Sequence, residues 1–481
     1  ITGNCQLNGA SRIDNHGTVK WNSAWPLTGW ENATIHNHAG GYYIFESPGD
    51  PFGNFFAGNR FLNDGTLLNR ATSPCEVNDW TVVSVGVMRT AEGAVTHVSG
   101  PLDLLDGARV EGAGPLRLTG STTTVRVTTT VATGALLDLA GASVNGHADG
   151  TGRVTGGAVE WSGGWLGGLL TVDASFAVVG PGGKWLAGAA ELRNAGAMTM
   201  VGIGSLNAWE NSVLRNLPGA TLHCAGTHHL GQFLGGNKLV NEGTMTIGGS
   251  PGRQTMDWAF QQTTTGTLVV EVAGSDPSPP EFDILQVSGG IQLGGILLAS
   301  TSGGYDPAEG QTFEIITGSP VSGTFIPQII KGFEIDYQPG AVLLVATGAG
   351  LAYATWAASY ELAGDAALPG MDPDGDGQVN FLEYAFNTSP ILAAASPTRF
   401  AVEENGGHAW LVLRYRMWQD RVDAGLNYQP QRSADLGVWL TEGIIDEPDL
   451  GAPPLAGSAA RRCRIPLHPG SREFLRLGVG F

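Results

Sequence analysis

A short pattern recurs along this chain: an asparagine, any residue, a glycine, then threonine or alanine and a short apolar alternation. Clear copies begin at Asn15, Asn63, Asn194 and Asn241, and looser copies begin at Asn32 and Asn216. Positions 194, 216 and 241 are 22 and 25 residues apart, and 48 residues separate positions 15 and 63. Periods of about 20–50 residues are typical of solenoids, and this one fits the coil of a right-handed parallel β-helix. Asparagine and glycine tolerate the left-handed conformation of a corner, and the apolar residue that follows can enter a stacked core.

The segments between these copies have the character of short strands cut by glycine, and almost no helical periodicity precedes residue 350. Glycine makes up 73 of the 481 residues, about twice its usual share of roughly 7%. Charged residues make up only 14% of the chain and apolar residues 42%, which is not the composition of a disordered protein. Short strands at regular spacing also fit a β-sandwich. Corners at coil spacing favour an all-β chain built mainly as a right-handed parallel β-helix, or β-solenoid.

A dense set of aromatic residues interrupts the repeat between positions 21 and 62. The first coil of a solenoid is exposed and needs a cap, so we predict that these side chains pack an N-terminal cap or insertion. A carbohydrate-stacking platform and a contact with a neighbouring subunit are the alternatives. The set consists of Trp21, Trp25, Trp30, Tyr42, Tyr43, Phe45, Phe52, Phe55, Phe56 and Phe61.

Residues 372–383 have the spacing of a calcium loop. The candidate ligands are Asp372, Asp374 and Asp376 at loop positions 1, 3 and 5, the backbone carbonyl of Gln378 at 7, Asn380 at 9 and Glu383 at 12. Gly377 falls at position 6, where the backbone must turn sharply. Because four acidic residues so close together would repel one another, we predict that Ca²⁺ binds here; a solvated acidic turn is the alternative. The loop stands alone in the sequence, which indicates a structural staple rather than a switch.

Parts of the chain resemble known families. Residues 190–348, whose strands lengthen after about position 265, resemble the closing coils of secreted β-helix and autotransporter-like passenger proteins. The unit formed by Trp356, the acidic loop and residues 381–386 resembles the dockerin-like calcium segment of secreted planctomycete and verrucomicrobial proteins. True cellulosomal dockerins carry two such loops and bind a cohesin, whereas this chain has one. Residues 428–439 resemble a motif of the small β-sandwich modules that accompany that segment.

These patterns predict four regions. Residues 1–95 hold N-terminal solenoid coils with the aromatic-rich cap or insertion, and residues 96–348 hold the parallel β-helix with its closing coils. Residues 349–395 form a short dockerin-like calcium-binding helix–loop–helix, in which residues 349–363 are the first credible helix. Residues 396–481 form a β-sandwich-like domain.

The charge balance and the ends of the chain bear on its location. The formal net charge is −19, from 44 acidic and 25 basic residues, which disfavours nucleic acid and anionic membranes as partners. No apolar run approaches 18 residues, so we expect no membrane span. The chain begins at Ile1 rather than methionine, as expected after removal of a secretory signal or after trimming. A calcium loop fits a calcium-rich exterior, and we predict a secreted or cell-surface protein of bacterial origin.

The four cysteines are widely spread and show no metal-ligand spacing, so three disulfide pairings are possible. We favour Cys5–Cys75, because both residues lie in the N-terminal region, and an oxidising exterior permits a disulfide. Cys224 and Cys463 are predicted to be free and buried.

Catalysis has to be considered because parallel β-helices include enzymes that degrade polysaccharides. Acidic residues between positions 100 and 260 are sparse and do not recur at the coil period, so they do not indicate the paired carboxylates of a glycosidase. His36 and His38, or His223, His228 and His229, could ligate a metal, although histidines near turns are more often solvated or hydrogen-bonded. We predict no catalytic residues, with a secreted carbohydrate-active β-helix enzyme, a polysaccharide lyase or glycoside hydrolase, as the alternative.

The combined prediction is an extracellular structural protein, a subunit of a self-assembling cell-surface fibre, sheath or adhesin stabilised by Ca²⁺. The expected partners are further copies of the chain, arranged head to tail, and surface glycans. An apolar strand at the C-terminus could complete a sheet or the first coil of the next subunit. The candidate assembly residues are Phe474, Leu475, Leu477, Val479 and Phe481.

Overall fold

The computed structural model describes residues 1–481 except 121, 127, 147–150, 250, 303–304, 327–332, 347–352, 354–355, 358, 394–395, 406, 419–425, 450–457, 469, 471 and 481. The protein is nearly all β, with 56% strand and 3% helix. It divides into two compact units. The first comprises Ile1–Gly304, Phe313–Gln328 and Asp336–Leu343, and the second comprises Tyr305–Thr312, Ile329–Ile335 and Leu344–Phe481.

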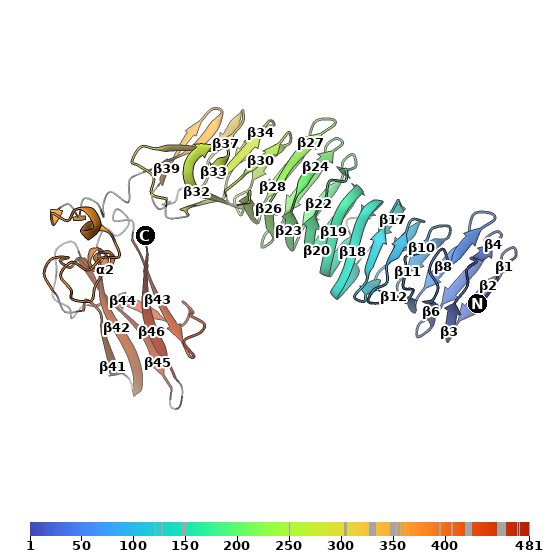
Figure 1. Ribbon diagram of the computed structural model, residues 1–481, viewed down its shortest axis with the longest axis horizontal. Helices are drawn as coiled ribbons and strands as arrows, with labels where there is room; N and C mark the ends of the chain where they lie inside the picture. Colours follow the sequence, from blue (N-terminus) through green and yellow to red (C-terminus); the bar gives the residue numbers. More distant parts are fainter. Residues whose placement is uncertain are drawn as a thin grey trace. The chain divides into compact units, whose positions relative to one another are not determined.

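The first unit is a parallel β-solenoid of about 12 turns, and Figure 1 shows its coils stacked as successive arrows from β1 onward. Each coil contributes a strand to each of three faces, and strands of neighbouring coils pair in parallel register. One face contains β1 (Cys5–Leu7), β4 (Leu27–Gly29), β7 (Phe52–Asn54), β10 (Cys75–Val77), β13 (Thr96–Val98), β16 (Pro115–Leu118), β23 (Ala197–Met200), β26 (Thr221–Cys224), β29 (Thr244–Ile247), β32 (Thr267–Pro277) and β36 (Ile296–Thr301).

The other two faces follow the same rule. The second contains β2 (Arg12–Asn15), β5 (Thr34–Asn37), β8 (Arg60–Asn63), β11 (Thr81–Ser84), β14 (Leu102–Leu104), β17 (Thr122–Val125), β21 (Lys184–Leu186), β24 (Ile203–Ala208), β27 (Thr227–Gln232), β30 (Arg253–Met256), β34 (Ile284–Val287), β37 (Thr312–Thr317) and β40 (Ala341–Ala346). The third contains β3 (Thr18–Trp21), β6 (Tyr42–Phe45), β9 (Thr66–Asn69), β12 (Val87–Thr90), β15 (Arg109–Glu111), β22 (Glu191–Asn194), β25 (Val213–Asn216), β28 (Lys238–Asn241), β31 (Ala259–Gln262), β35 (Ile291–Leu293) and β38 (Val321–Gly323).

Three long strands, β18 (Thr128–Gly146), β19 (Arg153–Gly167) and β20 (Leu169–Val178), bend around corners and contribute to more than one face. Two further strands, β33 (Pro280–Phe282) and β39 (Phe333–Gln338), complete the described strands of the region. Along most of the short strands, buried and partly exposed residues alternate, because successive side chains point to opposite faces. The predicted coil spacing is confirmed, since residues 15, 37 and 63 pair in register, and so do 194, 216 and 241.

The asparagines of the repeat, apart from the exposed Asn32, are buried, and their side chains form hydrogen-bonded ladders between coils. Asn194 Nδ2 donates to Asn216 Oδ1 at 2.8 Å, and Asn216 Nδ2 donates to Asn241 Oδ1 at 2.9 Å. None of the three has a positive φ angle, so the expected left-handed corner conformation is wrong for them. The glycine that follows is needed for close packing instead: a Cβ at Gly243 would collide with the carbonyl oxygen of Ala220 in the preceding coil.

The prediction that residues 21–62 interrupt the repeat is wrong. This segment supplies strands β4 to β8, and all of them pair in register with neighbouring coils. Half of the aromatic set points inward and fills the solenoid core, because stacked coils of this width need large side chains between their faces. The buried members are Trp21, Tyr43, Phe45, Phe52 and Phe61.

The second unit contains short helices and two antiparallel sheets. Tyr353, Trp356, Ala357 and Ser359 lie in α-helical conformation, followed by the 3₁₀ helix η1 (Gly364–Ala367) and α2 (Asn380–Phe386). One sheet has the order β41 (Arg399–Asn405), β42 (His408–Trp418), β45 (Ser458–Leu467) and β44 (Ile445–Pro448); the other pairs β43 (Asn427–Ser433) with β46 (Phe474–Gly480).

Both sheets and α2 share one apolar core. Phe386 of α2 packs with Leu413 and Tyr415 of β42, Ile465 of β45 and Leu475 of β46. The two predicted regions 349–395 and 396–481 therefore lie in the same compact unit. The all-β solenoid followed by a short helical segment and a sandwich-like arrangement is confirmed. In the described part of the chain, every helix is too short or too polar to cross a membrane.

Candidate functional site

The acidic loop folds as its residue types predict. Asp372 accepts hydrogen bonds from the backbone N–H groups of Gly375 and Gly377, both at 2.9 Å. Gly377 has a φ angle of 92°, which only glycine adopts without strain, and this confirms the predicted sharp turn. Oxygen atoms of Asp372, Asp374 and Asp376 all lie within 4.8 Å of one another. The loop thus gathers three carboxylates around one point.

Glu383 faces this cluster from α2. Its side chain is 0% exposed, and neither of its carboxylate oxygens has a hydrogen-bond partner. Burial raises the pKa of Glu383 to about 7, and the charges of Asp374, Asp376 and Asp372 add to the effect. Leaving a buried carboxylate without a partner is costly. A hard cation with several oxygen ligands would remove this cost, so the donor set fits Ca²⁺.

The remaining candidate ligands differ from the sequence expectation in detail. Asn380 uses its side-chain N–H₂ group to hold the segment around η1, donating to the carbonyls of Ala366 at 2.7 Å and Leu368 at 2.9 Å. The Oδ1 atom of Asn380 and the Oε1 atom of Gln378 are both buried, and neither has a hydrogen-bond partner. Asn380 therefore has a clamping role between η1 and α2 that loop spacing alone does not reveal.

A second feature is an exposed aromatic corner on the solenoid, which we call the first Trp–Phe corner (Trp30, Asn32, Phe55, Phe56 and Asn59). Trp30 and Phe55 stack with ring centroids 4.6 Å apart and an angle of 12° between the planes. Phe55 and Phe56 are each 58% exposed. Asn59 supports the loop: its Oδ1 accepts the N–H of Ala33 at 2.8 Å, and its Nδ2 donates to the carbonyl of Phe56 at 2.8 Å.

The same corner is built again about 178 residues later; this second Trp–Phe corner comprises Trp209, Asn211, Phe233, Leu234 and Asn237. Trp209 and Phe233 stack at 4.5 Å and 20°. Asn237 Oδ1 accepts the N–H of Ser212 at 2.9 Å, and its Nδ2 donates to the carbonyl of Leu234 at 2.6 Å. Phe233 is 61% exposed and Leu234 is 44% exposed.

The backbone repeats as closely as the side chains. Asn32 and Asn211 have φ angles of 53° and 51°, so these two asparagines do adopt the left-handed corner conformation. In the next coil, Trp80 Nε1 donates to the carbonyl of Gly53 at 3.0 Å, and Trp258 Nε1 donates to that of Gly231 at 2.7 Å.

The sequence contains the signal for this duplication. Trp-Glu-Asn occurs at 30–32 and again at 209–211, and Gly-x-Phe-x-x-Gly-Asn occurs at 53–59 and again at 231–237. Each copy is followed by Asp-Trp, at 79–80 and 257–258. This longer period is superimposed on the shorter asparagine–glycine period.

No family model matches the chain, and a comparison with curated proteins finds no match. The candidate sites therefore rest on the geometry described above.

The predicted Cys5–Cys75 disulfide is wrong: the structure has both residues as free thiols. Cys5 lies in the first coil and pairs with Leu27, which pairs with Phe52, whereas Cys75 pairs with Gly49 one coil further on. Three coil steps of about 4.8 Å separate their backbones by more than the roughly 7 Å that a disulfide spans. Cys224 and Cys463 are free and buried, as predicted.

The predicted assembly strand belongs to the second unit's own fold. All of β46 pairs with β43 in antiparallel register, and Leu475 is buried in the core shared with β42 and β45. Leu477 and Val479 pack against that core, Phe474 is half-buried, and Phe481 lies outside the described residues. The apolar character of this strand is therefore used within the chain.

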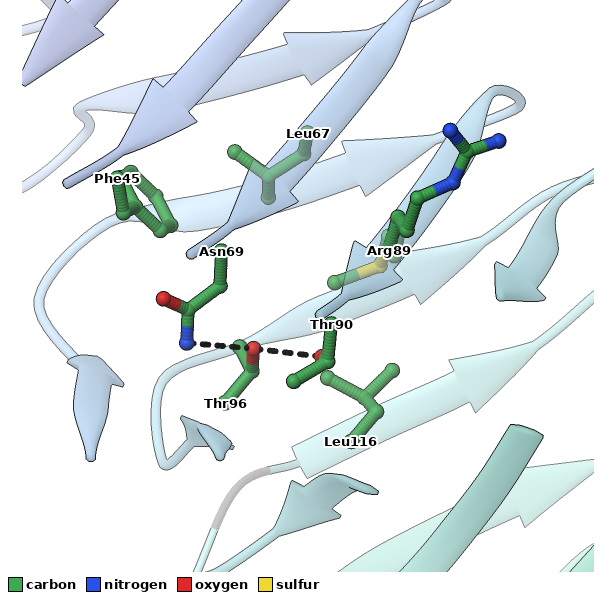
Figure 2. Close-up of a pocket in the computed structure, with 8 residues that line it drawn as sticks. Phe45, Leu67, Asn69, Arg89, Thr90, Thr96 and Leu116 are labelled. Carbon is green, nitrogen blue, oxygen red and sulfur yellow. Dashed lines mark hydrogen bonds between the residues drawn. The ribbon is translucent and has the colours of Figure 1, made fainter. Parts of the chain in front are cut away.

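Figure 2 shows a small cavity inside the solenoid, with a volume of about 10 Å³. Its polar groups bond to one another, since Asn69 Nδ2 donates to Thr96 Oγ1 at 3.0 Å and the Thr96 and Thr90 hydroxyls lie 2.7 Å apart. Arg89 at its edge pairs with Glu111. This is room for about one water molecule, far less than the roughly 300–1,000 Å³ of a ligand pocket, so the cavity is not a candidate ligand site.

Proposed function

We propose that the chain is an extracellular structural protein, a calcium-stabilised solenoid of a cell-surface fibre, sheath or adhesin, whose two Trp–Phe corners bind surface glycans. The observation that carries the proposal is the duplicated corner. A solenoid needs no exposed Trp–Phe stack to fold, and here the same exposed stack is built twice with the same supporting hydrogen bonds.

The chemistry of the corners favours a glycan as the occupant. Exposed aromatic patches mark interaction sites, and a free ring face suits the C–H face of a sugar while nearby polar groups bind its hydroxyls. Beside Phe55, the backbone N–H of Asn54 donates to the exposed carboxylate of Asp79 at 3.1 Å. Glu31 and Glu210 follow the two tryptophans and are exposed. Each corner thus combines an apolar surface with hydrogen-bond acceptors.

The spacing of the corners suits a repetitive ligand. About 178 residues of solenoid correspond to about eight coils, or roughly 40 Å along the solenoid axis at about 4.8 Å per coil. The first corner follows strands of the first face (β4 and β7), and the second follows strands of the second face (β24 and β27). Two weak sites held at a fixed distance on a stiff support bind a polymer or a coated surface far more tightly than either site alone. This arrangement supports an adhesin-like or matrix-binding role.

Surface charges on the solenoid support a structural role. Arg215 pairs with Glu191 at 2.8 Å and with Glu242 at 2.7 Å, which links three successive coils. Glu46 pairs in the same way with Lys20 at 3.2 Å and Arg70 at 3.0 Å. Carboxylates placed between cations of neighbouring coils stabilise cross-strand packing and are poorly placed to act as catalytic acids or bases.

Retention of the calcium-loaded full chain on immobilised polysaccharides tests the glycan proposal. Trp30→Ala with Phe55→Ala removes the first corner, and Trp209→Ala with Phe233→Ala removes the second. We expect each double variant to lose at least 10-fold in apparent affinity because avidity is lost, and the variant lacking both corners to lose retention. Trp25→Ala, which removes a tryptophan that is 62% exposed outside the corners, serves as the control and should bind like the parent.

Two outcomes would contradict this function. If the variant lacking both corners bound every polysaccharide as the parent does, the corners would not be the binding sites. Release of shortened sugars during the assay, and its loss on substitution of a carboxylate, would instead favour the carbohydrate-active enzyme.

Self-assembly into a fibre is a separate part of the proposal. Strands β1, β2 and β3 of the first coil pair only with β4, β5 and β6 among the described strands, and such open edges invite pairing with another chain. Electron microscopy of the purified protein should show fibres; uniformly single particles at high concentration would reject this part alone.

A further inference from the structure

A cluster of histidines and aspartates lies on the outside of the first three coils; we call it the histidine patch (Asp14, His16, His36, His38 and Asp64). Its members flank the buried asparagines at positions 15, 37 and 63. Asp14 and His36 are register partners in neighbouring coils. Because residues two apart on a strand share a face, the coil stack collects all five side chains on one surface.

The side chains of the patch are in direct contact. The rings of His36 and His38 lie 3.7 Å apart, and His16 stacks on His38 at 4.0 Å with an angle of 8°. His38 Nε2 lies 2.7 Å from Asp14 Oδ1, and His36 Nε2 lies 2.7 Å from Asp64 Oδ2. Three imidazoles and two carboxylates thus meet within one small area.

Three ligand atoms in the patch converge as a metal site requires. One ligand atom each from Asp14, His36 and His38 lies within 4.8 Å of the others. His36 Nδ1 and His38 Nε2 lie 4.0 and 2.7 Å from the same oxygen of Asp14. A tetrahedral Zn²⁺ with bonds of about 2.0–2.1 Å separates its ligand atoms by roughly 3.4 Å. Small side-chain shifts would therefore close the site.

Two neighbouring side chains, Asp64 and Arg12, contact the proposed ligand His36. Asp64 bonds to His36 Nε2, the nitrogen opposite the converging Nδ1, and a carboxylate in that position orients and strengthens a histidine ligand. Arg12 lies 2.9 Å from His36 Nδ1 and pairs with Asp14 at 2.8 Å in this structure. A metal ion must therefore displace Arg12 from both residues, and the half-exposed side chain can then extend into solvent. A cation that replaced Arg12 would keep Asp14 neutralised.

We propose that the histidine patch is a binding site for a divalent transition metal of the zinc class, with His36, His38 and Asp14 as ligands and Asp64 as a positioning residue. Imidazole is a preferred ligand for this class, whereas the oxygen-only acidic loop prefers Ca²⁺. The site is independent of the calcium loop and of the glycan proposal. It would tie together the three coils that contain β2, β5 and β8.

Calorimetric titration with ZnCl₂ of the untagged full chain, first saturated with Ca²⁺, tests the proposal. We expect one strong Zn²⁺ site, a loss of at least 100-fold in affinity in His36→Gln and in His38→Gln, and a loss of about 10–100-fold in Asp64→Asn, the usual effect of removing such a partner. Arg12→Met should bind Zn²⁺ more tightly than the parent, because a competing cation is removed. A purely structural ion-pair network would not respond in this way.

His229→Gln is the matched control, because His229 also pairs with a carboxylate, Asp257, at 3.1 Å on the same solenoid. It should leave Zn²⁺ binding unchanged, and the circular dichroism of every variant should match that of the parent. Absence of a Zn²⁺ site in the calcium-saturated parent would overturn the proposal. So would equal affinities in His36→Gln, His38→Gln and the parent, which would place the metal elsewhere.

Discussion

Asn37 and Asn63 occupy the same corner position in consecutive coils, and Asn37 Nδ2 donates to Asn63 Oδ1 at 2.9 Å. Asn63 in turn donates to the Ser84 hydroxyl at 3.1 Å. Both asparagines are 0% exposed, so each amide depends on its neighbours in the stack. A buried amide that loses its partner retains the full cost of desolvation.

Interrupting the ladder formed by Asn194, Asn216 and Asn241 should therefore destabilise the solenoid. Asn216 accepts from Asn194 and donates to Asn241 and to the carbonyl of Thr244. We expect Asn216→Ala to lower the free energy of unfolding by roughly 2 kcal/mol or more, measured by chemical denaturation. Asn8→Ala, at an exposed asparagine, should change it by less than about 0.5 kcal/mol. Equal effects of the two substitutions would show that the ladder adds no stability.

These ladders show how far the sequence predicts the fold. The spacing of the asparagines gave the coil length and register correctly, because a stacked corner must recur once per coil. The physical reason inferred for them was wrong: Asn216 is extended and acts through its side chain, whereas Asn32 has the left-handed conformation. Residue identity alone does not distinguish these two uses of asparagine, since the partner amide lies some 20 or more residues away.

The candidate sites divide in the same way. The acidic loop is local in sequence, so its residues could be predicted from spacing. The Trp–Phe corners and the histidine patch each combine residues from two or three coils. Trp30 contacts Phe55, and Asp14 contacts His38, only because the coil length brings them into register. Such sites become visible once the register is known.

Thiol titration should distinguish the free cysteines from the predicted disulfide. Burial raises the pKa of Cys75, Cys224 and Cys463 to about 12, so these thiols should not react in the folded protein. Cys5 is only partly buried. We expect a thiol reagent to modify Cys5 alone in the native state and all four cysteines after unfolding without reductant. Two reactive thiols after unfolding would instead indicate a disulfide.

Calcium should stabilise the second unit through Glu383. At a Ca²⁺ concentration about 100 times the dissociation constant, binding to the folded state alone adds about 2.7 kcal/mol. We expect the melting temperature of the parent to fall on addition of excess chelator, and Glu383→Gln to remove most of this calcium dependence. Glu442→Gln, at an exposed position in the same unit, should retain it. A melting curve of the parent that is unaffected by chelator would refute the prediction that bound Ca²⁺ stabilises this unit.

Leu475 should be required for folding of the second unit rather than for assembly alone. It is 6% exposed and packs with residues of α2, β42 and β45. We expect Leu475→Ala to lower the free energy of unfolding by about 2–4 kcal/mol, whereas Leu440→Ala, at a side chain that is 53% exposed, should have little effect. Deleting residues 475–481 would therefore disrupt the fold as well as any assembly. If Leu475→Ala were as stable as the parent, the strand would not be needed for folding, and the prediction that it mediates assembly would be favoured again.

Asp283 should make the stability of the solenoid depend on pH. It is 3% exposed and accepts backbone hydrogen bonds from Gly252 at 2.8 Å and Glu271 at 2.9 Å. Burial dominates and raises its pKa from 3.8 to about 7. Between these two values the unfolded chain has lost a proton that the folded chain retains, so the free energy of unfolding falls as pH rises through this window.

Asp283→Asn removes this titrating group. Because the amide cannot accept both backbone hydrogen bonds, the variant should be less stable than the parent at pH 4. The difference should shrink by a few kcal/mol at most as the pH rises to 7, since each unit of pKa shift corresponds to about 1.4 kcal/mol. Denaturation at pH 4, 5.5, 7 and 8 measures this change, with Asp106→Asn at an exposed position as the control. A stability difference between parent and Asp283→Asn that is constant across this range would show that Asp283 is ionised throughout, with its two backbone N–H partners outweighing its burial.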